Sequence, residues 1–129
     1  VIHLMEDQKS IQNFGGTMRL GKYPCQLAAG SKLASIYNAS HIEERHRHRY
    51  EFNNAYLQAF TEHGMIPVGT NPENQLVEAV EVASHPFFIG TQYHPEYKST
   101  VEKPHPLFIA FVKAAKAYRD SKSQATLAK

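Results

Sequence analysis

The chain has 129 residues and a mass of 14.6 kDa, and 42% of its residues are hydrophobic while 20% are charged. This size and composition are those of one globular domain and exclude a disordered or fibrous chain. The formal net charge of +2 is too balanced to predict nucleic-acid binding over the whole surface. No apolar run spans a bilayer, and Cys25 is the single cysteine, so we expect no membrane contact and a reducing, cytoplasmic compartment.

The first part of the chain predicts short elements separated by glycine and proline. Gly21 and Pro24 are expected to interrupt any strand that reaches them. In chain order we expect an apolar run at 1–5, a tight turn at Gly15 and Gly16, a strand at 17–20, an apolar stretch at 25–29 and weak helical turns at 31–37.

Residues 42–53 give the clearest strand pattern, because two kinds of side chain alternate along them. Arg45, Arg47 and Arg49 fall on one side of an extended chain. The other side receives His46, His48, Tyr50 and Phe52. We expect one continuous strand here.

The second half predicts a helix, a hairpin, a buried strand and a final helix. Asn53 or Asn54 is the expected N-cap of a short helix that Gly64 ends. Residues 65–68 and 76–82 are expected to pair as an antiparallel hairpin, and the apolar start of 87–93 predicts a strand covered on both faces. A helix after Pro106 carries an apolar stripe that we expect to pack on the sheet, followed by a flexible polar tail at 121–129.

His94, Pro95 and Glu96 follow the expected buried strand, at the end of the sheet where catalytic groups collect. Pro95 stiffens the segment and favours extended geometry at His94, so the side chains of His94 and Glu96 can point the same way. A carboxylate that accepts the Nδ1 proton of an imidazole leaves Nε2 free to act as a base. The alternative is a structural loop in which His94 only forms hydrogen bonds with the backbone. A three-residue motif does not exclude this alternative.

The nucleophile that such a base would activate is not evident in the sequence. Cys25 lies between Tyr23 and Leu27 rather than among the small residues of a nucleophile elbow, so we expect it to be a buried core residue. His46 and His48 could provide two metal ligands, but no third ligand stands at a recognisable spacing, and we expect no metal site. The arginine run could bind carboxylate or phosphate, or could be a solvated strand face.

Three segments of the chain share a longer pattern. They are Gly-Gly-Thr-Met-Arg-Leu-Gly at 15–21, Glu-Arg-His-Arg-His-Arg-Tyr-Glu at 44–51, and His-Pro-Phe-Phe at 85–88 followed by Gln-Tyr-His-Pro-Glu at 92–96. Together they resemble the glutaminase domain of the CTP synthase family, a class I glutamine amidotransferase, in order from about Val1 to about Tyr118. The resemblance implies an α/β fold, the C-terminal half of a flavodoxin-like, three-layer α/β/α domain with a mixed sheet, over residues 1–120.

The resemblance also implies residue roles. His94 would be the general base and Glu96 its orienting partner for a cysteine that attacks the side-chain amide of glutamine, while Arg49 would hold the substrate α-carboxylate and Tyr50 would line the same pocket. The chain carries neither the family's Gly-rich oxyanion loop nor its Gly-x-Cys-x-Gly elbow. We therefore expect a fragment that is inactive alone and needs the rest of the glutaminase domain.

Cofactors and partners follow from the same resemblance. No cofactor is expected in this chain, and its expected partners are L-glutamine, the rest of the glutaminase domain and the synthetase domain. The full enzyme would use ATP and Mg²⁺, bind UTP, ATP and GTP, and form a homo-oligomer, namely a tetramer. Two other interpretations stay open: a non-catalytic glutaminase remnant that serves packing or assembly, and a class I amidotransferase that serves another synthase.

Overall fold

The computed structural model describes residues 1–4 and 18–127, with side chains up to residue 123. The expected turn at Gly15 and Gly16 and the start of the 17–20 strand lie outside these residues. The elements, in chain order, are β1 Ile2–Leu4, β2 Arg19–Leu27, α1 Lys32–Tyr37, β3 His41–His48, β4 Tyr50–Phe52, the 3-10 turn η3 Asn54–Tyr56, α2 Leu57–Glu62, β5 Met65–Thr70, β6 Val77–Val82, β7 Ile89–Thr91, the 3-10 turn η4 Pro95–Lys98 and α3 Pro106–Leu127.

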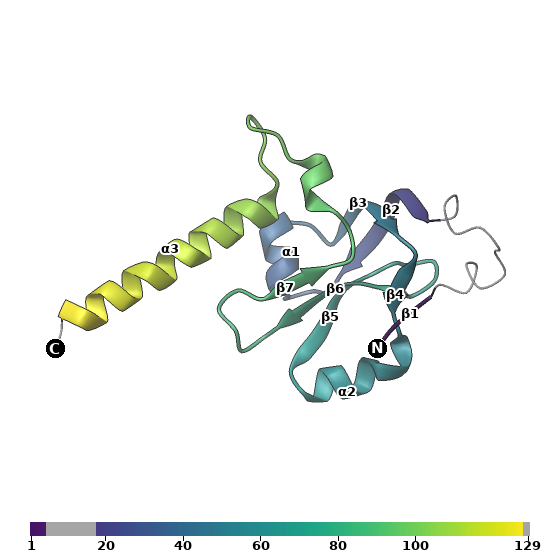
Figure 1. Ribbon diagram of the computed structural model, residues 1–129, viewed down its shortest axis with the longest axis horizontal. Helices are drawn as coiled ribbons and strands as arrows, with labels where there is room; N and C mark the ends of the chain where they lie inside the picture. Colours follow the sequence, from purple (N-terminus) through teal and green to yellow (C-terminus); the bar gives the residue numbers. More distant parts are fainter. Residues whose placement is uncertain (5–17, 128–129) are drawn as a thin grey trace.

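The strands form one large and one small sheet (Figure 1). The large sheet has the order β3-β2-β5-β6-β7, and β1 pairs separately with β4. Every pairing among the described strands is antiparallel, so the parallel part of the expected mixed sheet does not occur between them. With α1, α2 and α3 around the sheets, the architecture is α/β as expected.

Strand β2 is longer than the sequence predicts, because Gly21 and Pro24 do not interrupt it. It runs for nine residues and pairs with β3 along its length, whereas its pairing with β5 covers only Gln26 and Leu27. At Pro24, one edge of the strand therefore has no neighbour among the described strands to accept an N–H, and a sheet tolerates proline at such a position. Gly21 has a φ of +107°, a conformation that glycine adopts without strain.

The expected single strand at 42–53 is two strands that bend apart at Arg49. β3 ends at His48 in the large sheet, and β4 begins at Tyr50 in the small one. The bend also changes the phase of the alternation, because Tyr50 is exposed while Glu51 and Phe52 are buried. The alternation predicted that Tyr50 shares a face with His46 and His48, and this prediction is wrong.

The helix and hairpin of the middle segment are confirmed. The Asn53 side chain accepts a hydrogen bond from the Ala55 N–H at the start of η3, and α2 follows and ends just before Gly64, whose φ is +86°. β5 and β6 pair antiparallel, with a register shift around Gly69.

The expected strand at 87–93 is shorter and lies at an edge. β7 covers only Ile89–Thr91 and pairs with β6 alone among the described strands. Phe88 precedes the strand and is exposed, so the apolar run does not mark a strand covered on both faces. Phe87 lies instead against Phe111 of α3, with ring centroids 5.7 Å apart.

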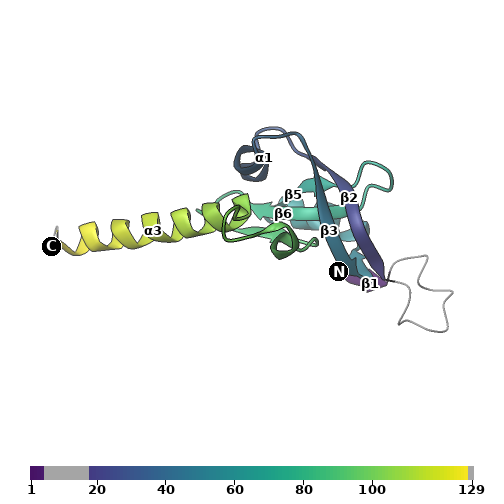
Figure 2. The ribbon, with the colours of Figure 1, turned by 90° about the horizontal axis from the view of Figure 1, so that it is seen from above.

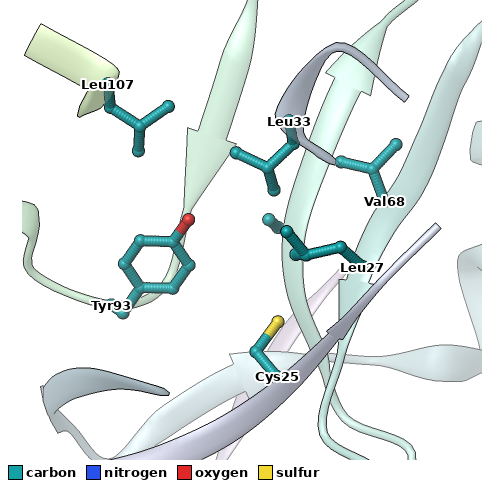
Figure 3. Packing of buried hydrophobic residues seen from close by; sticks show 7 residues of the cluster. Cys25, Leu27, Leu33, Val68, Tyr93 and Leu107 are labelled. Atoms are coloured by element: carbon teal, nitrogen blue, oxygen red, sulfur yellow. The ribbon is translucent and has the colours of Figure 1, made fainter. Parts of the chain in front are cut away.

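A small core forms where α1 covers the large sheet. Leu33 of α1 is fully buried there, and Figure 3 shows it among side chains from β2, β5 and the segment after β7. The buried members are Cys25, Leu27, Leu33, Val68, Ala79, Tyr93 and Leu107. This core lies directly beneath the start of the loop that carries His94.

Helix α3 does not pack along the sheet as its apolar stripe predicted. Leu107 at its start is buried, but the helix then extends away from the rest of the molecule in both views (Figures 1 and 2). Phe108, Phe111, Val112 and Tyr118 of the stripe are exposed. The helix continues past residue 121, where we expected the polar tail to begin. Within the described residues, no helix is long and apolar enough to cross a bilayer.

Candidate functional site

The segment from Gln92 to Lys98 is held against strands β3 and β4. The Gln92 side-chain amide donates to the carbonyl of Tyr50 at 3.0 Å, and the backbone N–H of His94 donates to the carbonyl of Arg45 at 2.8 Å. His94 itself has extended backbone geometry, and the Pro95–Lys98 turn starts directly after it. These contacts bring together the two segments to which the sequence assigned site residues.

His94 and Glu96 point toward each other. His94 Nδ1 lies 2.6 Å from Glu96 Oε1, and the His94 ring stacks on Tyr97, with centroids 5.0 Å apart and planes 16° apart. An ionised carboxylate only accepts, so Nδ1 carries a proton, and in the neutral form of the ring Nε2 then has the free lone pair. The hydrogen bond from His94 lowers the pKa of Glu96, which keeps its carboxylate ionised. The imidazole is 36% exposed, so a reacting group can approach it.

Arg49 and Tyr50 lie at the bend between β3 and β4. Arg49 is half-buried, whereas Tyr50 is exposed, and the Tyr50 carbonyl accepts from both Gln92 and His48 Nδ1. Arg45 and Arg47, the other arginines of the run, are exposed on β3. The bend therefore separates Arg49 from the other two and leaves it directly before Tyr50, whose carbonyl binds Gln92, two residues before His94.

A buried polar cluster supports this bend. His48 Nδ1 donates to the Tyr50 carbonyl, so the His48 Nε2 accepts from His46 Nδ1, 2.9 Å away. Burial, followed by the nearby Arg19, lowers the pKa of His46 to about 3, and burial lowers that of His48 to about 4. Both rings are thus neutral at physiological pH and form a fixed chain of hydrogen bonds to the backbone of the site.

Glu78 on β6 completes a set of three candidate metal donors with His46 and His48, whose ligand atoms lie within 4.8 Å of one another. The third donor comes from a strand distant in sequence, so spacing could not have revealed it. However, Arg19 already pairs with Glu78, and the His46–His48 hydrogen bond occupies one nitrogen of each ring. A cation would meet the buried guanidinium, and we therefore assign this cluster a structural role.

Cys25 is buried in the core, as expected. Its side chain is 1% exposed, and burial followed by the negative charges of Glu78 and Glu44 raises the pKa of its thiol to about 12. A thiol that stays protonated and enclosed is a poor nucleophile.

Sequence reasoning missed Glu44, whose side chain is fully buried on β3. Its carboxylate receives hydrogen bonds from three other parts of the chain: Tyr37 of α1, Lys98 of η4 and His105 just before α3. The signal was available, because Glu44 continues the alternation of His46 and His48 one step backwards along the strand. A charged side chain on the buried side of a strand is expected to have hydrogen-bond partners there, because an unpaired buried charge is unfavourable.

Two curated proteins that are similar to the chain carry the name CTP synthase. A CTP synthase from Cytophaga hutchinsonii is 60% identical over 122 residues, which cover 95% of this chain and 23% of that protein. A CTP synthase from Bacteroides thetaiotaomicron is 62% identical over 115 residues, which cover 89% of this chain and 21% of that protein. The chain thus spans less than a quarter of the length of these curated relatives.

Solved structures agree with these relatives. The glutaminase domain of Trypanosoma brucei CTP synthase, solved with bound acivicin, matches with a TM-score of 0.80 and 33% identity over 91% of this chain and 46% of that one. A GMP synthase-like protein from Thermoplasma acidophilum matches with a TM-score of 0.59 and 19% identity over 84% of this chain and 49% of that one, which supports the fold alone. The family model of class I glutamine amidotransferases matches residues 3–114. The chain therefore has the expected fold and belongs to the class I glutamine amidotransferase family.

Proposed function

We propose that this chain forms part of the glutaminase domain of a CTP synthase, in which glutamine is hydrolysed to supply ammonia for the amination of UTP. The observation that carries the proposal is the 2.6 Å contact between His94 Nδ1 and Glu96 Oε1 beside the Arg49–Tyr50 bend. A non-catalytic remnant would have no need to keep an imidazole oriented by a carboxylate at an accessible position.

In the proposed mechanism, the nucleophile is a cysteine thiolate from a part of the enzyme outside this chain. His94 Nε2 removes the thiol proton, the thiolate attacks the side-chain amide carbon of glutamine, and the protonated His94 returns the proton to the departing ammonia. Water then hydrolyses the glutamyl thioester, with His94 again as the base. Glu96 fixes the tautomer and stabilises the imidazolium that forms.

Arg49 is proposed to bind the α-carboxylate of glutamine, and Tyr50 to line the same pocket. A guanidinium pairs with a carboxylate through two parallel hydrogen bonds, which sets the orientation of the substrate as well as its affinity. The bend at Arg49 supports this assignment, because it separates this arginine from Arg45 and Arg47, and the next residue, Tyr50, binds the Gln92 side chain through its carbonyl.

Further proposals concern the whole enzyme and rest on its similarity to CTP synthases. ATP, Mg²⁺, UTP and GTP would bind elsewhere in the enzyme, and no residue of this chain is proposed as their ligand. We also propose a homotetramer and a cytoplasmic location, the latter supported by the unpaired, buried thiol of Cys25.

The decisive experiment replaces His94 by alanine in the complete enzyme. His94→Ala should reduce CTP formation from glutamine by several orders of magnitude and leave formation from free ammonia intact, since only the first reaction needs the base. Both activities are followed as CTP formation. His41→Ala is the matched control, because His41 is exposed at the start of β3 and contacts Ser40 through its ring. Equal loss of both activities, or no loss of either, would contradict the proposal.

A further inference from the structure

Glu44 is the most highly connected buried charge near the site. Its side chain lies on β3 with no exposed surface, and its Oε1 is 3.1 Å from the Tyr37 hydroxyl, 3.1 Å from His105 Nε2 and 3.3 Å from Lys98 Nζ. Burial alone would raise the pKa of Glu44, but the hydrogen bond from His105 and the charge of Lys98 outweigh this effect and lower it. The carboxylate is therefore an ionised acceptor at neutral pH.

Lys98 connects Glu44 to the turn that carries the proposed base. Lys98 is the last residue of η4, and its ammonium group also donates to the backbone carbonyl of Glu43 at 2.6 Å. At the other end of the turn, the His94 N–H donates to the carbonyl of Arg45. The turn is thus fixed at both ends to three consecutive residues of β3, and Glu44 is the middle one.

Tyr37 and His105 connect Glu44 to the segments on either side of this turn. The Tyr37 hydroxyl lies 3.3 Å from that of Tyr93, the buried residue directly before His94. The backbone N–H of His105 donates to the hydroxyl of Ser99, the residue directly after η4. One carboxylate therefore fixes the chain before, within and after the segment from His94 to Lys98.

We propose that Glu44 is a positioning residue for glutamine hydrolysis: it holds the His94–Lys98 turn on β3 so that the imidazole and its carboxylate partner meet the substrate in a fixed orientation. Glu44 acts through Lys98, Tyr37 and His105 and has no contact with the reacting atoms. This inference rests on the proposed function. It goes beyond it by assigning a role to a residue that is remote from the chemistry.

The test uses Glu44→Gln in the complete enzyme. The amide keeps the size of the side chain and an oxygen that can face the three donors, but it loses the negative charge that pairs with Lys98. Its NH2 group takes the place of the buried Oε2, which has no hydrogen-bond partner among the described residues. We expect kcat with glutamine to fall roughly tenfold to a hundredfold, as for a misplacement of about 1 Å at a catalytic group. KM for glutamine and CTP formation from ammonia should change little.

The matched control is Glu43→Gln on the same strand. The Glu43 side chain is exposed and pairs with Lys22, while its backbone carbonyl, which holds Lys98, is kept. This variant should match the wild type in kcat and KM. An unchanged kcat in Glu44→Gln, or a change confined to KM, would overturn the proposal.

A second variant separates positioning from folding. Lys98 has a 41% exposed side chain, so Lys98→Ala should fold even if Glu44→Gln does not. We expect Lys98→Ala to lower kcat with glutamine, Lys98→Arg to restore most of the loss because it keeps a cationic donor, and the double variant to lose less than the product of the two single losses. A Lys98→Ala enzyme with wild-type kcat, no rescue by arginine, or multiplicative losses would each refute the role of Glu44.

The failure of this inference is distinct from a failure of the proposed function. If His94→Ala keeps its activity with glutamine, the function itself is wrong. If His94→Ala loses that activity while the Glu44 and Lys98 variants keep theirs, only the positioning role is wrong.

Discussion

A single short hydrogen bond defines the chemistry of the site at the scale of the residue. With Glu96 ionised, His94 holds a proton on Nδ1, which leaves Nε2 of the neutral ring for the base role that we propose. Pro95 between them has no N–H to satisfy and a restricted φ, so it keeps the two side chains on one rigid segment.

Replacing Glu96 by glutamine tests this orientation. Glu96→Gln should lower kcat with glutamine severely, since the analogous change in a Ser-His-Asp triad costs on the order of 10⁴. The pKa of Glu96 is lowered in the folded protein, so the carboxylate is ionised at neutral and alkaline pH and is lost only as the pH falls through that lowered value.

The pH profile gives this prediction its sign. The ratio of wild-type to Glu96→Gln activity should be constant at neutral and alkaline pH. It should fall toward one only in acid, where the wild-type carboxylate becomes protonated. A steady-state pH profile with glutamine measures it, and Glu102→Gln, an exposed residue on the loop before α3, serves as the control. A ratio that falls toward alkaline pH would contradict the proposed role of the Glu96 carboxylate.

Some contacts of single side chains could be predicted from the sequence, and others could not. The His94–Glu96 contact was predictable, because both residues stand on one stiff segment after a strand. The alternation could have placed Glu44 on the buried side of its strand, but it could not name the partners of Glu44 or Glu78. These come from elements distant in sequence, such as Arg19 for Glu78 and His105 for Glu44. Long-range partners of this kind need the tertiary structure.

At the scale of the element, Gly69 of β5 leaves no room for a side chain between the neighbouring strands β2 and β6. A Cβ added there would lie 2.8 Å from Cys25 Sγ and 3.1 Å from Ala79 Cβ. Gly69 has no positive φ, so lack of space, and not backbone strain, requires glycine at this position.

Gly69→Ala should therefore destabilise the chain by about 1–3 kcal/mol, the usual cost of overpacking a core. The cost should be smaller in a Cys25→Ala background, because that change removes the sulfur atom that the new methyl group meets. Urea unfolding of the four members of the double-mutant cycle measures the coupling. Gly90→Ala on the edge strand β7, where the new Cβ meets only Val80 Cγ2 at 3.2 Å, is the milder control. Additive losses at Gly69 and Cys25 would refute this account.

The elements themselves were partly readable from the sequence. The β5–β6 hairpin and the capped α2 helix follow from local turn and cap residues, and they are confirmed. The continuity of β2 through Pro24 and the bend at Arg49 depend on which strands lie alongside, so local rules placed the boundaries incorrectly.

At the scale of the molecule, helix α3 leaves much of its apolar stripe uncovered. Phe111 is 57% and Val112 is 64% exposed, although both belong to the stripe that predicted packing on the sheet. Apolar faces of this kind associate readily in water. The periodicity indicated an apolar face correctly but could not say what lies against it.

The purified 129-residue chain should consequently self-associate as its concentration rises. Phe111→Glu combined with Val112→Glu should shift it toward the monomer, which sedimentation velocity can measure. Lys116→Glu is the control on the same helix, because it changes the net charge by the same amount at an exposed polar position. Equal association of all three proteins would show that the stripe is not responsible.

The bend at Arg49 also constrains how the proposed glutamine-binding site can change. Neighbouring residues on its two sides are anchored in different sheets, each with its own register against a partner strand. Inserting or deleting one residue there would force one of the two sheets to slip by a residue and turn its side chains over. Any alteration of the ligand that this arginine is proposed to bind must therefore come from exchanging side chains at constant chain length. The segment is thus a suitable target for substitution libraries and a poor one for loop grafting.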